Sequence, residues 1–65
     1  MQITNSIKAL RKERGLRQED LAAAVGVSRQ TIIALETGRY NPSLELALKL
    51  SKVLEKKVEQ IFSLS

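Results

Sequence analysis

The chain has 65 residues, a length typical of one small domain with a modest core. It contains no cysteine and no histidine, which excludes disulfides and the common zinc sites, so no cofactor is expected. Eleven Lys and Arg against seven Asp and Glu leave a net charge of +4, which favours a polyanionic partner. Signal-peptide and membrane-span patterns are not found, so we expect a cytoplasmic protein without a membrane partner.

The few helix-breaking residues, one proline and three glycines, favour an all-α fold of five helices in a single domain, residues 1–65. The predicted helices span about residues 6–14, 18–25, 29–37, 44–54 and 58–62. Asn5, Ser28 and Ser43 are the predicted N-caps of the first, third and fourth helices. Each glycine follows a helix, as C-terminal capping requires. The ends of the chain suit either short strands or frayed termini.

The second and third predicted helices have the pattern of a helix-turn-helix. Two helices that meet steeply need a small residue where they cross, and Ala22 supplies it. The turn needs a residue that tolerates positive φ, and Gly26 supplies it. The apolar positions that would face the core are Leu21, Val25, Val27, Ile32 and Leu35. An ordinary helical hairpin is the alternative interpretation.

The outward side of the third predicted helix favours the helix-turn-helix interpretation. Its residues combine two long polar side chains with small or apolar ones, a mixture that suits the DNA major groove. Arginine can bond guanine, glutamine can bond adenine, and a methyl group can contact the thymine methyl. The predicted base-contacting residues are Ser28, Arg29, Gln30, Ile33, Ala34 and Thr37.

The stretch "LRQEDLAAAVGVSRQTIIALETGRYNPSLELALKL" resembles the Cro/C1-type helix-turn-helix family, the lambda-repressor-like domain of bacterial and phage regulators. The resemblance extends from about Ile7 to Phe62 and is strongest to short stand-alone members. It implies that the second and third helices read DNA and that Gln18 contacts a backbone phosphate. It also implies an ion pair between Arg11 and Glu36, which would position helices more than stabilise them.

The resemblance also implies that the loop after the third helix lies along the DNA backbone. Arg39, Tyr40 and Asn41 are therefore predicted to contact phosphate, although Tyr40 could instead pack against the fourth helix. Arg17 departs from the family pattern, because Ser or Thr commonly caps the second helix there. We expect this cap to be lost and the Arg17 charge to serve a phosphate.

Two further departures fall at the C-terminal end. Lys57 replaces a cap of the fifth helix, and Glu55 stands where glycine is common, which predicts a less sharply turned connection. Apolar residues here exceed what a short helix needs to dock on its own chain, which predicts a homodimer interface formed by Val58, Ile61, Phe62 and Leu64. Ile3 would join it through strands over residues 2–4 and 62–65.

These observations predict a DNA-binding regulator. We expect a repressor that reads the major groove of double-stranded DNA, at a palindromic operator, as a homodimer. A protein-interaction module with the same fold is the alternative, and an antitoxin role is compatible with DNA binding. An enzyme is not expected, because the chain offers no histidine, no cysteine and no pair of acids suited to a cleft.

Overall fold

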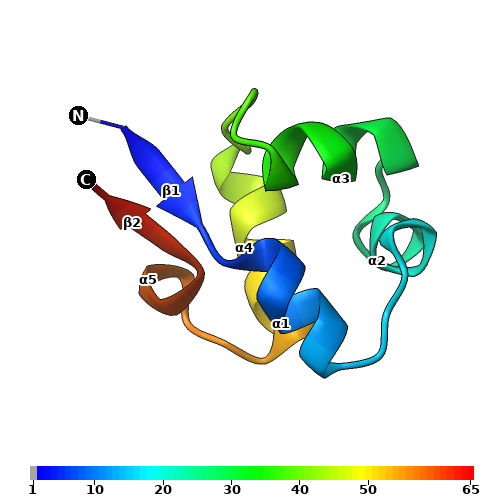
Figure 1. Ribbon diagram of the computed structural model, residues 1–65. Coiled ribbons are helices and arrows are strands. Elements are labelled where there is room, and N and C mark those ends of the chain that lie inside the picture. The colour runs from blue at the N-terminus through cyan, green and yellow to red at the C-terminus, as the bar shows by residue number, and fades with distance from the viewer. Residues whose placement is uncertain (1) are drawn as a thin grey trace.

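The computed structural model describes residues 2–65, which form five helices and two short strands. These elements are β1 (Ile3–Asn5), α1 (Ile7–Glu13), α2 (Gln18–Val25), α3 (Arg29–Glu36), α4 (Leu44–Leu54), α5 (Val58–Ile61) and β2 (Phe62–Leu64). Helices α1 to α4 surround the centre of the molecule, and the strands stand at one end with both termini (Figure 1). The predicted helices are present, and each agrees with its predicted bounds to within one residue.

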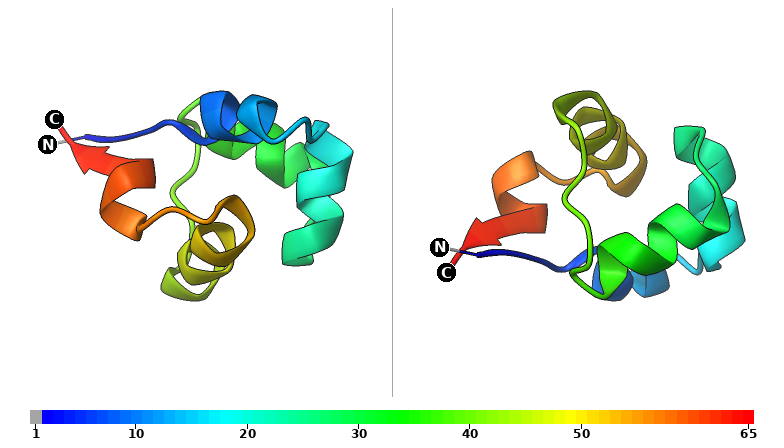
Figure 2. Two further views of the ribbon diagram at one scale, coloured as in Figure 1. Left: turned by 90° about the horizontal axis from the view of Figure 1, so that it is seen from below. Right: turned by 90° about the horizontal axis from the view of Figure 1, so that it is seen from above.

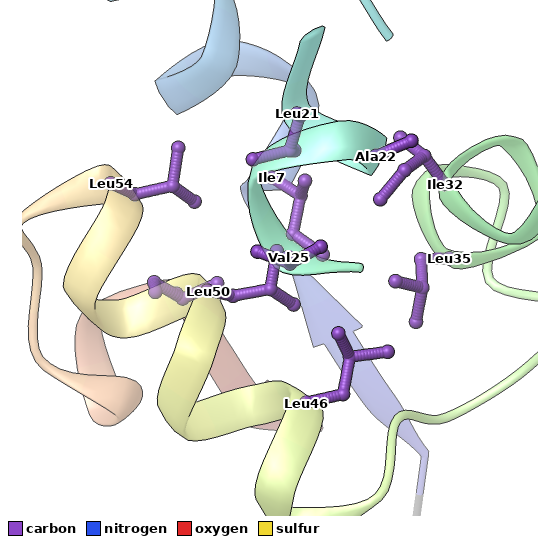
Figure 3. Packing of buried hydrophobic residues seen from close by; sticks show 10 residues of the cluster. Ile7, Leu21, Ala22, Val25, Ile32, Leu35, Leu46, Leu50 and Leu54 are labelled. Carbon is purple, nitrogen blue, oxygen red and sulfur yellow. The ribbon is translucent and has the colours of Figure 1, made fainter. Parts of the chain in front are cut away.

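The core lies between α4 and the first three helices. Leucines four residues apart on α4 point toward α2 and α3, as Figure 3 shows. A fully buried leucine or isoleucine side chain contributes about 1.5–3 kcal/mol by leaving water, so this cluster is the main source of stability. The large side chains that are almost completely buried are Ile7, Leu21, Ile32, Leu35, Leu50, Leu54 and Ile61.

Four helices end in the same way, with one residue in the left-handed conformation. Gly15, Gly26 and Gly38 follow α1, α2 and α3 with φ of 69°, 75° and 76°. Glu55 follows α4 with φ of 54° and is the only non-glycine residue at positive φ among residues 2–65. The prediction of a less sharply turned connection at Glu55 is therefore wrong, because Glu55 adopts the conformation that a glycine would.

Contacts from Arg14, the C-cap residue of α1, accompany the unusual turn at Glu55. Arg14 donates from Nε to the Leu54 carbonyl at 3.1 Å, and its Nη2 lies 2.9 Å from Oε2 of Glu55. One arginine therefore binds both a terminal carbonyl of α4 and the side chain of the residue that ends it. A cation at a helix C-terminus is also favoured by the helix dipole.

The predicted N-caps differ in their outcome. Ser43 caps α4, accepting from the Leu46 amide at 3.1 Å, as predicted. The N-cap of α1 is Ser6 rather than Asn5, because Asn5 belongs to β1 and its Oδ1 accepts from the Ile7 amide at 3.1 Å. At α5 the Lys57 side chain provides no cap, as predicted, but Gln60 Oε1 accepts from the Lys57 amide at 2.8 Å.

The two terminal segments form strands rather than frayed ends. They pair antiparallel, with Ile3 opposite Leu64 and Asn5 opposite Phe62. Since residues directly opposite each other share a face, these four side chains lie on one face and polar residues occupy the other. Ile3 and Leu64 are 40% and 66% exposed, so this apolar cross-strand pair extends beyond the core.

Candidate nucleic-acid interface

The turn between α2 and α3 fixes the relative position of these two helices. Gly26 is left-handed, and the Val27 amide donates back to the Ala22 carbonyl at 3.0 Å. This bond closes α2 in a Schellman motif. Ala22 is 3% exposed and lies beside Ile32 of α3 (Figure 3), so its small side chain occupies the helix crossing as predicted.

The N-terminal end of α3 is capped and faces solvent. Ser28 Oγ accepts from the Thr31 amide at 3.2 Å, which confirms the predicted cap. The same hydroxyl lies 3.1 Å from Thr31 Oγ1, so it is engaged within the helix, and a base contact by Ser28 stays a prediction. Arg29 and Gln30 follow in the first turn, and both are exposed.

The rest of the outward side of α3 is more apolar. Ile33 and Ala34 are half-buried, and Thr37 is exposed just after the helix. The Thr37 hydroxyl donates to the Ile33 carbonyl at 2.9 Å and also lies 3.3 Å from the Ala34 carbonyl. Because this hydroxyl is bonded to backbone, the side chain is left with its methyl group as the free contact.

Helix α2 lies at the end of the molecule away from the strands (Figure 2), and its first residue, Gln18, contacts Glu36 of α3. Asp20 Oδ2 accepts from the Arg17 amide at 2.9 Å and from Arg17 Nε at 3.1 Å. These hydrogen bonds hold the pKa of Asp20 below its usual value. The Arg17 side chain provides no cap, as predicted, and Asp20 satisfies the Arg17 amide instead.

A buried polar cluster joins the three helices behind this surface. Arg11 Nε donates to Glu36 Oε2 at 2.6 Å and Nη2 donates to Oε1 at 3.2 Å, so the ion pair that the resemblance implied is present. Gln18 Nε2 donates to the same Oε1 at 3.2 Å. Burial opposes ionisation of Glu36, but hydrogen bonds from Arg11 and Gln18 outweigh it and lower the pKa of Glu36.

The loop between α3 and α4 crosses the same side of the molecule (Figure 2, right). Arg39 is exposed, and its amide donates to the Ala34 carbonyl at 3.0 Å, which ties the start of the loop to α3. Tyr40 is 42% exposed and lines a shallow hollow with Val27 of the turn and Leu46 of α4. Tyr40 and α4 therefore line the same hollow, and part of the Tyr40 side chain faces solvent.

Known proteins resemble this chain in both sequence and fold. The family model described as Helix-turn-helix matches residues 7–61. An uncharacterised HTH-type transcriptional regulator of Methanocaldococcus jannaschii is 55% identical over 58 residues, 89% of this chain and 88% of that protein. The chain belongs to the Cro/C1-type helix-turn-helix family.

Two other relatives are repressors. The cryptic phage CTXphi transcriptional repressor RstR of Vibrio cholerae is 43% identical over 49 residues, 75% of this chain and 44% of that protein. The P22 c2 repressor protein, solved in complex with a synthetic operator, has a TM-score of 0.79 and 38% identity and covers 82% of this chain and 80% of its own. These Cro/C1-type relatives are named as regulators or repressors, not as enzymes.

The structure corrects one residue of the predicted dimer interface. Ile61 is 1% exposed in the isolated chain, so its side chain belongs to the core of its own protomer. Val58 and Phe62 are half-buried, and Leu64 is exposed. The pattern of the sequence could not separate Ile61 from its neighbours, because a four-residue helix contains only one turn of periodicity.

Two features of this Cro/C1-type surface were missed at the level of sequence. Glu19 Oε1 lies 3.9 Å from Arg29 Nε, and its Oε2 lies 3.7 Å from Arg17 Nη1, which puts a carboxylate between two predicted DNA contacts. The hydrogen bond from Gln18 to Glu36 was missed as well. The position of Glu19 beside Gln18 was the available sequence signal for the carboxylate, whereas the Gln18–Glu36 hydrogen bond depends on the fold.

Among residues 2–65, every helix is too short or too polar to span a membrane.

Proposed function

We propose that this chain is a sequence-specific transcriptional repressor that reads the major groove of double-stranded DNA as a homodimer, with α3 as the reading helix. The observation that carries the proposal is the exposure of Arg29 and Gln30 at the capped N-terminal end of α3. In helix-turn-helix proteins that end of the second helix contacts base edges. The membership of the Cro/C1-type family and the net charge of +4 support it.

The proposal divides the surface into reading and holding residues. Arg29 and Gln30 would bond bases, and the methyl-bearing side chains behind them, Ile33, Ala34 and Thr37, would line the groove. Since the Thr37 hydroxyl is bonded to backbone, its methyl group suits a thymine methyl. The residues proposed to hold phosphate flank α3 and are Arg17, Gln18, Arg39, Tyr40 and Asn41. Phosphate contacts fix register without reading sequence.

The homodimer would form through the apolar face of the terminal sheet. Ile3 and Leu64 are exposed there beside the half-buried Phe62 and Val58. A twofold dimer places two reading helices about 34 Å apart, which matches a palindromic operator. Sedimentation tests this interface with a matched pair. Leu64→Asp should shift a dimer to monomer, whereas Ser63→Asp, on the polar face of the same strand, should not.

The division between reading and holding is tested by two arginine variants on a selected operator and on scrambled DNA. Losing a bidentate Arg–guanine contact costs about 1–3 kcal/mol and relaxes discrimination at that base pair. Losing a phosphate contact weakens binding to every sequence and lowers the salt slope by about one unit. Arg29→Ala should therefore reduce the ratio of operator to scrambled affinity, while Arg39→Ala should preserve it. Equal weakening of both duplexes by Arg29→Ala would make Arg29 a phosphate contact.

A further inference from the structure

The Glu36 carboxylate collects hydrogen bonds from two other helices. Arg11 of α1 donates to both of its oxygens, and Gln18 at the start of α2 donates to Oε1 at 3.2 Å. The side chains of Arg11 and Glu36 are 8% and 3% exposed, so this arrangement is held away from solvent. Gln18 is half-buried and lies at the edge of the cluster. The cluster therefore connects a buried charge to a residue at the proposed DNA surface.

The chemistry of the Gln18 amide determines which of its two ends faces Glu36. An ionised carboxylate only accepts hydrogen bonds, so it requires the nitrogen end of the amide to face it. One N–H of Nε2 is used in that bond, and the second N–H is left as a donor. A phosphate oxygen also only accepts, so the end of the amide that remains free is the end that phosphate needs.

We propose that Glu36 is a positioning residue that orients Gln18 for its phosphate contact. The inference rests on the proposed function, because it takes Gln18 as one of the holding residues. Without the carboxylate, the amide can rotate and turn its oxygen toward the phosphate. Its side chain also becomes free to sample other rotamers, which the bound state must then restrict. Glu36 thus contributes to DNA affinity through Gln18 without touching DNA.

A double-mutant comparison isolates this effect from the stability of the fold. Replacing both members of a buried ion pair by apolar residues of similar volume is often tolerated, so we would use Arg11→Met/Glu36→Met, checked by a melting curve. DNA affinity is measured with and without this change in two backgrounds, wild type and Gln18→Met. We expect the change to weaken binding about three- to tenfold when Gln18 is present, since freeing one side chain has a cost of that order. In the Gln18→Met background we expect less than a twofold effect.

The other outcomes identify which idea fails. An equal loss in both backgrounds overturns the positioning role and leaves the Gln18–phosphate contact standing. If Gln18→Met alone changes nothing, the contact and the inference fail together, while discrimination by Arg29 still tests the reading helix. A measurement on the unmodified chain covers the case in which the paired variant does not fold. In nuclear magnetic resonance spectra, one Gln18 side-chain amide proton should be shifted in the free protein and the other should shift on adding operator DNA. Failure of the second proton to shift overturns the inference.

Discussion

Arg11 on helix α1 and Arg14 at its C-cap each bind a glutamate from a distant part of the chain. Arg11 contacts Glu36 at 2.6 Å with side chains 8% and 3% exposed. Arg14 contacts Glu55 at 2.9 Å with side chains 37% and 71% exposed. The two ion pairs have similar nitrogen–oxygen distances but differ greatly in their exposure to solvent. Losing one partner of a buried pair leaves a charge without compensation, whereas water replaces a lost partner at the surface.

The two pairs also serve different parts of the molecule. The buried pair holds α1 against α3, directly behind the surface proposed to read DNA. The exposed pair lies at the turn from α4 to the terminal segment, where the proposed dimer contact begins. We therefore expect the part of the domain formed by α1, α2 and α3, here called the reading half, to be sensitive to charge substitutions. The turn after α4 should tolerate them. The following experiments test this difference.

The largest effect is expected from Glu36→Gln. This change keeps the shape of the side chain but leaves the buried Arg11 guanidinium without a counter-charge, which typically costs about 3–5 kcal/mol. Urea unfolding of the variant measures the loss. Glu55→Gln is the matched control, and we expect it to cost at most about 1 kcal/mol because both partners are largely hydrated. Equal losses in the two variants would contradict the assigned role of burial.

Acid should break the buried pair without a substitution. The pKa of Glu36 is lowered in the folded protein, so folding stability gained from its ionisation is fully present above the unfolded value, about 4.3. As pH falls below that value, the unfolded state takes up the proton first and stability declines. Asp20 has a lowered pKa too and adds to the trend. Thermal melts from pH 6 to pH 3 on wild type and on Arg11→Met/Glu36→Met should show a weaker pH dependence in the variant.

Apolar packing provides a second way to break the reading half. Ala22 is buried at the α2–α3 crossing, and Ala22→Leu adds volume where Ile32 already lies. Such overpacking typically costs about 1–3 kcal/mol. The control is Ala24→Leu on the same helix, where the side chain is exposed and the change should be nearly neutral. Melting curves by circular dichroism separate the two, and an unchanged midpoint for Ala22→Leu would argue against this crossing.

The difference between the two regions also explains what the sequence could predict. The α2–α3 unit depends on local chemistry, because Ala22, Gly26 and Ser28 each satisfy a requirement of their own backbone neighbourhood. Patterns of residue type therefore predicted it. The Arg11–Glu36 pair joins residues 25 apart in the sequence and was reached only through the resemblance to a family.

Other features of the structure depend on tertiary contacts, which local sequence patterns do not predict. Glu55 takes a left-handed conformation at which sequence rules favour glycine, and the two hydrogen-bonding contacts from Arg14 that accompany it come from 40 or more residues away. Ile61 was assigned to a partner surface because its burial depends on how α5 packs. The residues proposed to contact DNA are exposed or half-buried, so they make few of the tertiary contacts that a fold reveals.

The smallest effects concern the turn at Glu55 and compare it with the turn at Gly26. Adding a Cβ to Gly26 meets no atom within 4 Å, so Gly26→Ala should cost only the backbone strain of a left-handed residue, about 1–2 kcal/mol. The reverse change, Glu55→Gly, removes that strain but also loses the ion pair with Arg14. Its net effect on the free energy of unfolding should therefore be small.

Comparing Glu55→Gly with Glu55→Gln separates the two contributions, because both variants lack the charge and only glycine relieves the backbone. We expect Glu55→Gly to be the more stable of the two by up to about 1 kcal/mol, since the greater freedom of glycine in the unfolded chain offsets part of the relief. Urea unfolding at two salt concentrations gives both values. If Glu55→Gly is instead the less stable variant, the uncharged part of the side chain at position 55 stabilises the turn by more than the left-handed backbone strain costs.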